Sequence, residues 1–218
     1  MVLSISLWKK RVLCLWHDWL NRHSFTIGSN NVLNNLGGIR IKTRIQISGN
    51  DNRIVIEKGS KLINTLIKIS GSRNEVVLKA YSHLSGVELW IEDDQCKIII
   101  GERTSVGHHS HLACTENGSE LIVGDDGMIS AHVQIRTGDS HSIIDNNGNR
   151  INYARSVIIG DHCWIGEGAK VMKGVILEGD DVISTGSIVT HSFGRNLLIG
   201  GVPARVLKER ISWDSRRL

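Results

Sequence analysis

Aliphatic residues recur at every sixth position between Val157 and Thr190, at Ile159, Ile165, Val171, Leu177, Ile183 and Val189. The residue two positions before each of them is mostly small. An amphipathic helix repeats about every 3.6 residues and a half-buried strand about every 2, so neither produces a sustained step of six. Hexapeptide repeats of this kind belong to β-helices, in which short strands stack into a solenoid. The pattern therefore predicts a β-helix with one inward aliphatic side chain on each strand.

The same step returns, less regularly, from residue 27 onward. Consecutive aliphatic triplets start 22 or 23 residues apart, at Leu33, Ile56, Leu78, Ile100 and Val123. We interpret each triplet as an 18-residue triangular coil with a few extra residues at one corner, such as SGNDNR and SGSRNE. The triplet that begins at Leu78 ends on Trp90 at the strict step, or on Ile91 one residue later. About seven coils result, with one strand of each coil on each of three parallel sheets.

One interruption separates Ile135 from Ile159. Residues 136–156 exceed the usual gap by about a dozen and are rich in Asn, Gly, Asp and Ser, so we expect an excursion loop that leaves the solenoid. Long loops in compact repeats are commonly functional. After Val189 the tail combines a strand-like LLIGGV with a short C-terminal helix after Pro203, because proline suits a first helical position. The predicted division is residues 1–26 as a cap, 27–192 as the β-helix and 193–218 as the tail.

Residues 4–22 are predicted to form an amphipathic helix. Its apolar stripe consists of Trp8, Val12, Leu15, Trp16 and Trp19, with polar side chains opposite. Such a helix would cap the open edge of the first coil. Three tryptophans beside basic residues leave a second interpretation open, namely weak contact with a membrane surface or with a partner.

Composition narrows the class of protein. The 218 residues carry a net charge of +4 and a pI near 9.0, a mild bias that favours anionic ligands. No cluster of aromatic and basic residues supports nucleic-acid binding. The four cysteines show no CxxC spacing and suit a reducing compartment. Because the sequence shows neither a membrane span nor a signal peptide, we expect a cytoplasmic protein, with the helix over 4–22 as a route to the periphery of the inner membrane.

Asp139, Ser140 and His141 stand together in the excursion loop. A neutral imidazole can accept a proton from a sugar hydroxyl near neutral pH, and a carboxylate can hold its tautomer. We therefore take His141 as a candidate base and Asp139 as its orienting group, with a solvated surface histidine as the alternative. Trp164 occupies an outward position, where its large apolar ring would contact a ligand or a neighbouring subunit.

A histidine cluster raises the question of a metal site. His108, His109 and His111 lie close together, and His109 and His111 would point to the same side of a strand. A catalytic zinc takes about three protein ligands and an open position, and these histidines lack a convincing three-ligand spacing. We expect no metal. A hexapeptide-repeat zinc enzyme of the carbonic anhydrase kind is the alternative.

The stretch VIIGDHCWIGEGAKVMKGVILEGDDVISTGSIVT, the preceding DSH and the following GVPAR occur together and in this order. They resemble the C-terminal half of the hexapeptide-repeat acetyltransferases, most of all the bacterial polysaccharide and capsular polysialic acid O-acetyltransferases. The resemblance covers residues 134–210 well and the earlier coils only by repeat pattern. It implies an all-β fold, the left-handed parallel β-helix, and a homotrimer that binds acetyl-CoA in clefts between subunits.

The resemblance also implies roles for individual residues. His141 matches the family's catalytic base for direct acetyl transfer, and Trp164 matches a tryptophan that lines the reacting centre. Positions that contact acetyl-CoA, from the pantetheine arm to the nucleotide, are matched by Glu167, Thr185, Thr190, Arg205 and Lys208. Arg and Lys suit the anionic nucleotide end. Several relatives carry lysine where this chain has His191, which weakens one phosphate contact, and Lys173 is the candidate that would compensate.

These features together predict an acetyl-CoA-dependent O-acetyltransferase. Its acceptor would be a hydroxyl of a bacterial surface glycan, such as capsule, O-antigen or a sialic-acid-type polysaccharide. A non-catalytic β-helical scaffold is a further alternative, although a scaffold has no need for the loop. Outward basic side chains would guide an anionic polymer, or simply form a solvated face: Lys42, Arg44, Arg53, Lys58 and Lys61.

Overall fold

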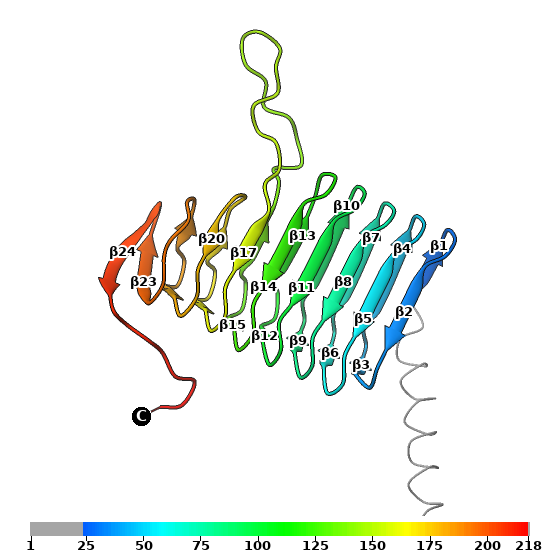
Figure 1. Ribbon diagram of the computed structural model, residues 1–218, viewed down its shortest axis with the longest axis horizontal. Coiled ribbons are helices and arrows are strands. Elements are labelled where there is room, and N and C mark those ends of the chain that lie inside the picture. Colours follow the sequence, from blue (N-terminus) through cyan, green and yellow to red (C-terminus); the bar gives the residue numbers. More distant parts are fainter. Residues whose placement is uncertain (1–23, 218) are drawn as a thin grey trace, which may run out of the picture.

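The structure is a computed structural model that describes residues 24–217. Every regular element in this part of the chain is a β-strand, and the strands stack into one elongated solenoid (Figure 1). The all-β solenoid predicted from the six-residue step is confirmed. The helix predicted over residues 4–22 lies outside the described residues and stays a prediction, as does the division of the chain into cap, solenoid and tail.

The strands form three sheets, called A, B and C here. Sheet A contains β1 (Phe25–Ile27), β4 (Arg44–Ser48), β7 (Leu66–Ser70), β10 (Glu88–Glu92), β13 (His111–Cys114), β16 (Gln134–Arg136), β19 (Lys170–Val171) and β22 (Ile188–Val189). Sheet B contains β2 (Val32–Asn35), β5 (Arg53–Ile56), β8 (Glu75–Leu78), β11 (Lys97–Ile100), β14 (Glu120–Val123), β17 (Val157–Ile159) and β20 (Ile176–Leu177). Sheet C contains β3 (Ile39–Ile41), β6 (Lys61–Ile63), β9 (His83–Ser85), β12 (Ser105–Val106), β15 (Met128–Ile129), β18 (Trp164–Ile165), β21 (Val182–Ile183), β23 (Leu197–Gly201) and β24 (Ala204–Glu209).

Each turn of the solenoid passes through sheets A, B and C in that order. A strand pairs in parallel with the strand of the same sheet one turn later, so the chain has a triangular cross-section. Sheet A has 8 strands, which gives one turn more than the roughly seven predicted. The strand that the prediction missed is β1, because the first predicted triplet, Leu33, Ile39 and Ile45, already covers β2, β3 and β4. Its apolar side chains, such as Phe25 and Ile27, are exposed and do not follow the buried step.

The six-residue step fills the interior of the solenoid. All six aliphatic side chains of the regular stretch are at most 1% exposed, and so are the companion residues Val157, Cys163, Ala169, Val175, Asp181 and Ser187. Strands of two or three residues bury little by themselves, so the hydrophobic stabilisation comes from stacking successive turns. The predicted inward positions are confirmed.

The irregular steps of the earlier coils come from longer strands in sheet A. β7 and β10 have five residues each and bury two side chains each, Ile67 with Ile69 and Leu89 with Ile91. Successive residues of a strand face opposite sides. Of the two core positions considered at this step, Ile91 is therefore inward and Trp90 faces out.

A ladder of asparagine side chains lines the corner between sheets A and B. Asn52 Oδ1 accepts the backbone N–H of Asn74 at 2.9 Å, and Asn74 Oδ1 accepts that of Cys96 at 2.7 Å. The two side-chain amides donate to the backbone carbonyls of Gly71 and Asp93, at 2.9 and 3.0 Å. Buried backbone groups need such partners, so the extra corner residues of the early coils form a hydrogen-bonded stack.

The tail differs from the prediction. Residues 204–209, expected to be helical, form β24, which pairs antiparallel with β23. The last turn of a solenoid leaves a sheet edge with unpaired backbone groups, and a returning strand satisfies them where a helix would not. The prediction of a short C-terminal helix is therefore wrong.

Asp181 is a buried acid in the last full turn. Its Oδ1 accepts the backbone N–H of Leu197 at 3.0 Å, whereas its buried Oδ2 has no hydrogen-bond partner within residues 24–217. Burial, helped by the charges of Asp180 and Glu178, raises the pKa of Asp181 to about 6. The folded chain therefore keeps this proton in a pH range in which the unfolded chain has lost it.

The substitution Asp181→Asn is expected to stabilise the protein above pH 6. Stability from the protonated acid is fully present below the unfolded pKa of 3.8 and is lost as pH rises through about 6. A shift of this size corresponds to roughly 2–3 kcal/mol. Thermal unfolding followed by circular dichroism should show a higher Tm for the variant at pH 7.5 and a smaller gain at pH 4.5. The exposed Glu209→Gln on β24 serves as the control, and an equal gain at both pH values would contradict the assignment.

Candidate active site

The excursion loop leaves the solenoid at the A–B corner. It starts after Arg136 at the end of β16 and returns at Val157. Figure 1 shows it projecting well beyond the other corners. At its tip Asp145 Oδ1 accepts the backbone N–H groups of Asn147 and Asn149, at 2.8 and 2.9 Å. The loop is therefore a hydrogen-bonded arm, and we refer to residues 137–156 as the arm.

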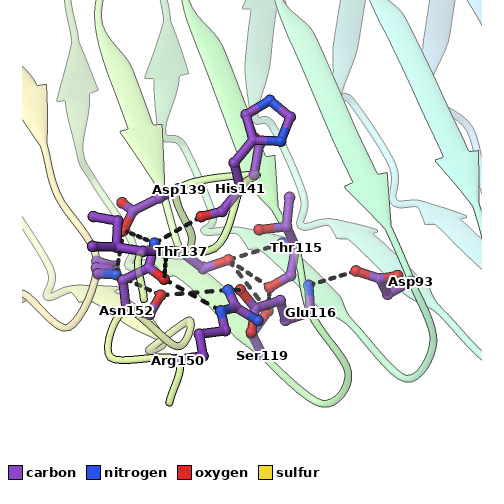
Figure 2. Close-up of polar contacts among 12 residues, drawn as sticks. Asp93, Thr115, Glu116, Ser119, Thr137, Asp139, His141, Arg150 and Asn152 are labelled. Carbon is purple, nitrogen blue, oxygen red and sulfur yellow. Dashed lines mark hydrogen bonds and ion pairs between the residues drawn. The ribbon is translucent and has the colours of Figure 1, made fainter. Parts of the chain in front are cut away.

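Asn152 fixes the base of the arm. The residue is 6% exposed, and its Nδ2 donates to Asp139 Oδ2 at 2.9 Å and to the backbone carbonyl of His141 at 2.8 Å. Its Oδ1 accepts the backbone N–H of Ile143 at 2.7 Å. One buried amide thus holds three points of the outgoing half of the arm (Figure 2).

Asp139 and Lys173 form an ion pair at the base of the arm. The Lys173 ammonium also donates to the backbone carbonyl of Asn152 at 2.8 Å. The hydrogen bond from Lys173, supported by the one from Asn152, holds the pKa of the Asp139 carboxyl below its usual value. Asp139 is consequently an anion at neutral pH. The Lys173 ammonium is thus engaged at the base of the arm, while β19, which precedes it, pairs with β22, which precedes Thr190. The predicted contact of Lys173 with the nucleotide phosphates stays a prediction.

His141 is exposed on the arm. Figure 2 shows its imidazole projecting away from Asp139, whose carboxylate is turned toward Asn152. The sequence hypothesis had the Asp139 carboxylate orienting the His141 ring. Within residues 24–217 the structure shows no contact between the two groups. Asp139 acts instead on the backbone beside His141, through Asn152, and the ring is open to a ligand or a second chain.

Trp164 stands on β18 of sheet C and is 36% exposed. Its indole N–H donates to Ser130 Oγ at 3.3 Å. Trp213, which the sequence analysis did not single out, returns over the same sheet. Its ring centroid lies 6.0 Å from that of Trp164 and 4.5 Å from that of His162, on which it stacks. A cavity of about 410 Å³ opens beside Trp213 and His162, and Trp164 is not among the residues that line it. The one feature of the sequence that could have pointed to Trp213 is a large aromatic residue in the tail, beyond the last repeat.

The positions matched to the pantetheine chain of CoA fall at one corner of the solenoid, between sheets C and A. Glu167 and Thr185 are exposed and lie one turn apart, since the carbonyl of Glu167 accepts the N–H of Gly186 at 2.8 Å. Gly168 and Gly186 have φ of 69° and 71°, and a methyl group added at either would meet no atom within 4 Å. This corner is therefore open along two turns and fits an extended chain laid against the backbone.

The remaining matched positions lie at the end of the solenoid. Thr190 follows β22, whereas Arg205 and Lys208 are on β24, and all three are exposed. The two cations are of the kind that binds phosphate. The His191 ring packs on Phe193, with 4.4 Å between the ring centroids, so an aromatic contact occupies this position.

The candidate groups divide between opposite sides of one chain. In a triangular solenoid the A–B corner, which carries the arm and His141, lies opposite sheet C, which carries Trp164. The structure thus brings Glu167 and Thr185 together, and it keeps His141 and Trp164 apart.

Known proteins show the same architecture. A polysialic acid O-acetyltransferase of Escherichia coli O1:K1 / APEC is 31% identical over 118 residues, which are 54% of this chain and 38% of that protein. The crystal structure of the polySia specific acetyltransferase NeuO gives a TM-score of 0.84 at 28% identity, over 90% of this chain and 84% of that chain. The polysialic acid O-acetyltransferase OatWY gives a TM-score of 0.83 at 26% identity, over 89% and 92%. The chain is similar in sequence and in fold to the left-handed β-helix acetyltransferases.

These comparisons confirm the predicted left-handed parallel β-helix and the resemblance noted in the sequence. No protein-family model matches the chain. By sequence, the chain spans only 38% of the length of the Escherichia coli relative. By structure, the two superpositions cover nearly the whole solenoid.

The histidines considered for a metal site divide between two places. The rings of His109 and His132 stack at the C–A corner with centroids 5.0 Å apart, and the His108 centroid lies 6.1 Å from that of His132. His111 starts β13, and its Nδ1 lies 3.3 Å from Glu88 Oε2. His109 is a turn residue with φ of 59°, so it does not share a strand with His111, contrary to the expectation. In the described part of the chain, no group of three or more His, Cys, Asp or Glu side chains could hold a metal ion.

The five outward basic residues do not gather on one surface. All are exposed. Arg53 forms an ion pair with Glu75 at 3.0 Å. Arg44 lies on sheet A, Arg53 on sheet B and Lys61 on sheet C. Lys42 and Lys58 lie in two different turns between strands. A single basic track for a polymer is therefore not formed by these residues within one chain.

Proposed function

We propose that the chain is an acetyl-CoA-dependent O-acetyltransferase that acetylates a hydroxyl of a bacterial surface glycan. The observation that carries the proposal is the arm, whose buried amide and ion pair hold an exposed histidine away from the solenoid. Homologues with this solenoid are named polysialic acid O-acetyltransferases. The acceptor class is capsule, O-antigen or a sialic-acid-type polysaccharide.

The C–A corner is the proposed seat of the donor. The pantetheine chain of CoA would run past Glu167 and Thr185, where Gly168 and Gly186 leave the backbone open. The nucleotide phosphates would lie toward Thr190, Arg205 and Lys208, since charge-assisted hydrogen bonds from Arg and Lys favour phosphate. The thioester would then face Trp164 on sheet C.

His141 would act as the general base. Its imidazole removes the proton from the acceptor hydroxyl as the oxygen attacks the thioester carbonyl carbon. The C–S bond of the tetrahedral intermediate then breaks, and the CoA thiolate takes the proton from the imidazolium. The acetyl group passes directly to the acceptor oxygen, without an acyl-enzyme. Backbone N–H groups and Trp164 would stabilise the oxyanion, and such contacts contribute a few kcal/mol each.

A second copy of the chain is proposed to complete the site. Outward side chains of sheet B form an apolar stripe in register, Val77, Ile99, Ile122, Ile158 and Ile176. Contiguous apolar surface of this kind marks an interaction site, and a homotrimer would cover the stripe on every subunit.

The arm itself points to the same arrangement. Ile143, Ile144 and Ile151 are exposed on it, although the arm is ordered by its own hydrogen bonds. A neighbouring subunit would bury these side chains. It would also supply the Trp164 face that the arm cannot reach from the opposite side of its own solenoid.

The proposed location is the cytoplasm or the cytoplasmic surface of the inner membrane. Cys96, Cys114 and Cys163 are buried free thiols, which suits a reducing compartment. In residues 24–217 no helix is long and apolar enough to cross a membrane.

Two measurements test the proposal. Acetyl-CoA is expected to raise the Tm in a thermal shift assay, because a ligand that binds only the folded state stabilises it. Release of free CoA thiol from acetyl-CoA is then expected on addition of oligosialic acid or another capsular oligosaccharide. Absence of an acetyl-CoA shift would support the scaffold alternative. Activity that disappears with a chelator and returns with zinc would support the metal alternative.

A further inference from the structure

A pocket of about 190 Å³ lies on the outer face of sheet A, next to the base of the arm. Its walls include Trp90, Ala113, Arg136 and Ser140. It is separate from the C–A corner proposed for the donor and from the cavity beside Trp213. We refer to it as the sheet A slot.

The register of sheet A gives the slot its shape. Trp90 pairs with Ala113, and Ala113 pairs with Arg136, on the consecutive strands β10, β13 and β16. Adjacent strands are about 4.8 Å apart, so the backbones at Trp90 and Arg136 stand about 10 Å apart. Ala113 between them carries only a methyl group and is 2% exposed. The result is a gap one side chain deep, with an indole on one side and a guanidinium on the other.

The indole of Trp90 turns its remaining face to the slot. Lys68, on the preceding strand β7, places its Nζ 3.8 Å from the ring centroid, on the side away from Ala113. The indole N–H donates to Glu92 Oε1 at 2.9 Å, which fixes the tilt of the ring. The His111 ring also borders the slot, with its centroid 5.9 Å from that of Trp90 at a tilt of 54°. The part of the indole that His111 leaves open offers a stacking surface for the C–H face of a sugar ring.

Arg136 brings an unsatisfied donor to the opposite wall. Its Nε is buried and has no hydrogen-bond partner in the described part of the chain. One terminal nitrogen donates to Ser140 Oγ at 2.6 Å. Asp139, an acidic neighbour, is already paired with Lys173. A buried donor without a partner is costly, and a carboxylate can satisfy a guanidinium with two parallel hydrogen bonds.

The slot is connected to the candidate base by the chain itself. Ser140 lines the slot and bonds Arg136, and the next residue is His141, whose backbone carbonyl is held by Asn152. A ring held in the slot would therefore lie beside the part of the arm that carries the imidazole.

We propose that the sheet A slot binds an acidic pyranose residue of the acceptor, with the ring against Trp90 and the carboxylate on Arg136. The inference rests on the proposed function and deepens its acceptor side only. Trp90, Ala113 and Arg136 determine which glycan is presented to His141, and none of them takes part in the bond changes.

The test is binding of a defined probe to the full-length protein by isothermal titration calorimetry. The probe is an α2,8-linked tetramer of sialic acid, and its neutral counterpart is the same tetramer with the carboxylates reduced to alcohols. Wild-type protein is expected to bind the acidic tetramer about tenfold or more tightly than the reduced one. Ala113→Leu, which fills the slot, is expected to weaken binding of the acidic tetramer about tenfold or more. Arg136→Gln is expected to remove the preference between the two.

Gln46→Leu is the matched control, because Gln46 stands in the same register of sheet A two strands before Trp90. It should bind both tetramers as the wild type does, and circular dichroism should show all variants folded. Equal affinity of wild type and Ala113→Leu for the acidic tetramer would overturn the proposal, as would no preference in the wild type. Thermal shift with acetyl-CoA separates the two ideas: a donor shift without tetramer binding removes the slot alone, whereas loss of the donor shift removes the proposed function.

Discussion

Replacing His141 by alanine is expected to lower the rate of acetyl transfer about 10²–10⁴-fold, the usual contribution of a general base. Affinity for acetyl-CoA should not change, because the residues proposed to bind the donor, such as Glu167 and Thr185, lie at the C–A corner and do not include His141. The Asn152 amide binds the backbone of His141, so the substitution leaves the arm in place. CoA release under saturating donor measures the rate, and calorimetry with CoA measures the affinity.

His83→Ala is the control for His141→Ala. His83 is also exposed, and it lies on β9 of sheet C, away from the arm. Its replacement should leave the rate unchanged. Near-normal transfer by His141→Ala, with normal donor affinity, would show that another group is the base.

Replacing Ile122 by glutamate is expected to dissociate the proposed homotrimer and to remove activity with it. Ile122 stands in the middle of the apolar stripe of sheet B, between Ile99 and Ile158. Burial of an unpaired carboxylate in an apolar interface is strongly unfavourable. The monomer would keep its solenoid, because Ile122 points out of the core, but would lose a site built from two chains. A drop of about 10²-fold or more is expected from such a loss of positioning.

Light scattering after size exclusion measures the oligomeric state of Ile122→Glu. Leu66→Glu is the matched control, since Leu66 is an outward, half-buried aliphatic residue of sheet A. It should remain oligomeric and active. A monomeric Ile122→Glu protein with full activity would contradict an intersubunit site.

The sequence predicts the core of this fold well because one physical rule governs it. After β17, each strand of the regular stretch has two residues and holds one inward aliphatic side chain, so burial repeats with the step of six. The excursion loop is visible as a break in that step. The tail was mispredicted because an open sheet edge pairs with β24, and no local pattern in residues 204–209 reports that edge.

The candidate site was predictable only in part. His141 and Trp164 stand out by residue type and position, and their roles stay predictions. The partners of Asp139 were not predictable: Lys173 follows it by 34 residues and meets it only through the stacking of turns. The same holds for Trp213, which contacts His162 across 51 residues. Trp90 was ambiguous, because the longer strands of sheet A shift the step by one.

The central claim is that one chain supplies His141 and its neighbour supplies the Trp164 face. Mixed trimers test it most directly, made by co-expressing His141→Ala chains with Trp164→Ala chains under two affinity tags. Each variant alone should be nearly inactive. Purification through both tags selects trimers that contain both chains, and one of the three interfaces in such a trimer pairs an intact His141 with an intact Trp164, so about a third of the wild-type activity should return. Mixed trimers no more active than either parent would contradict the account and place both residues of each site in a single chain.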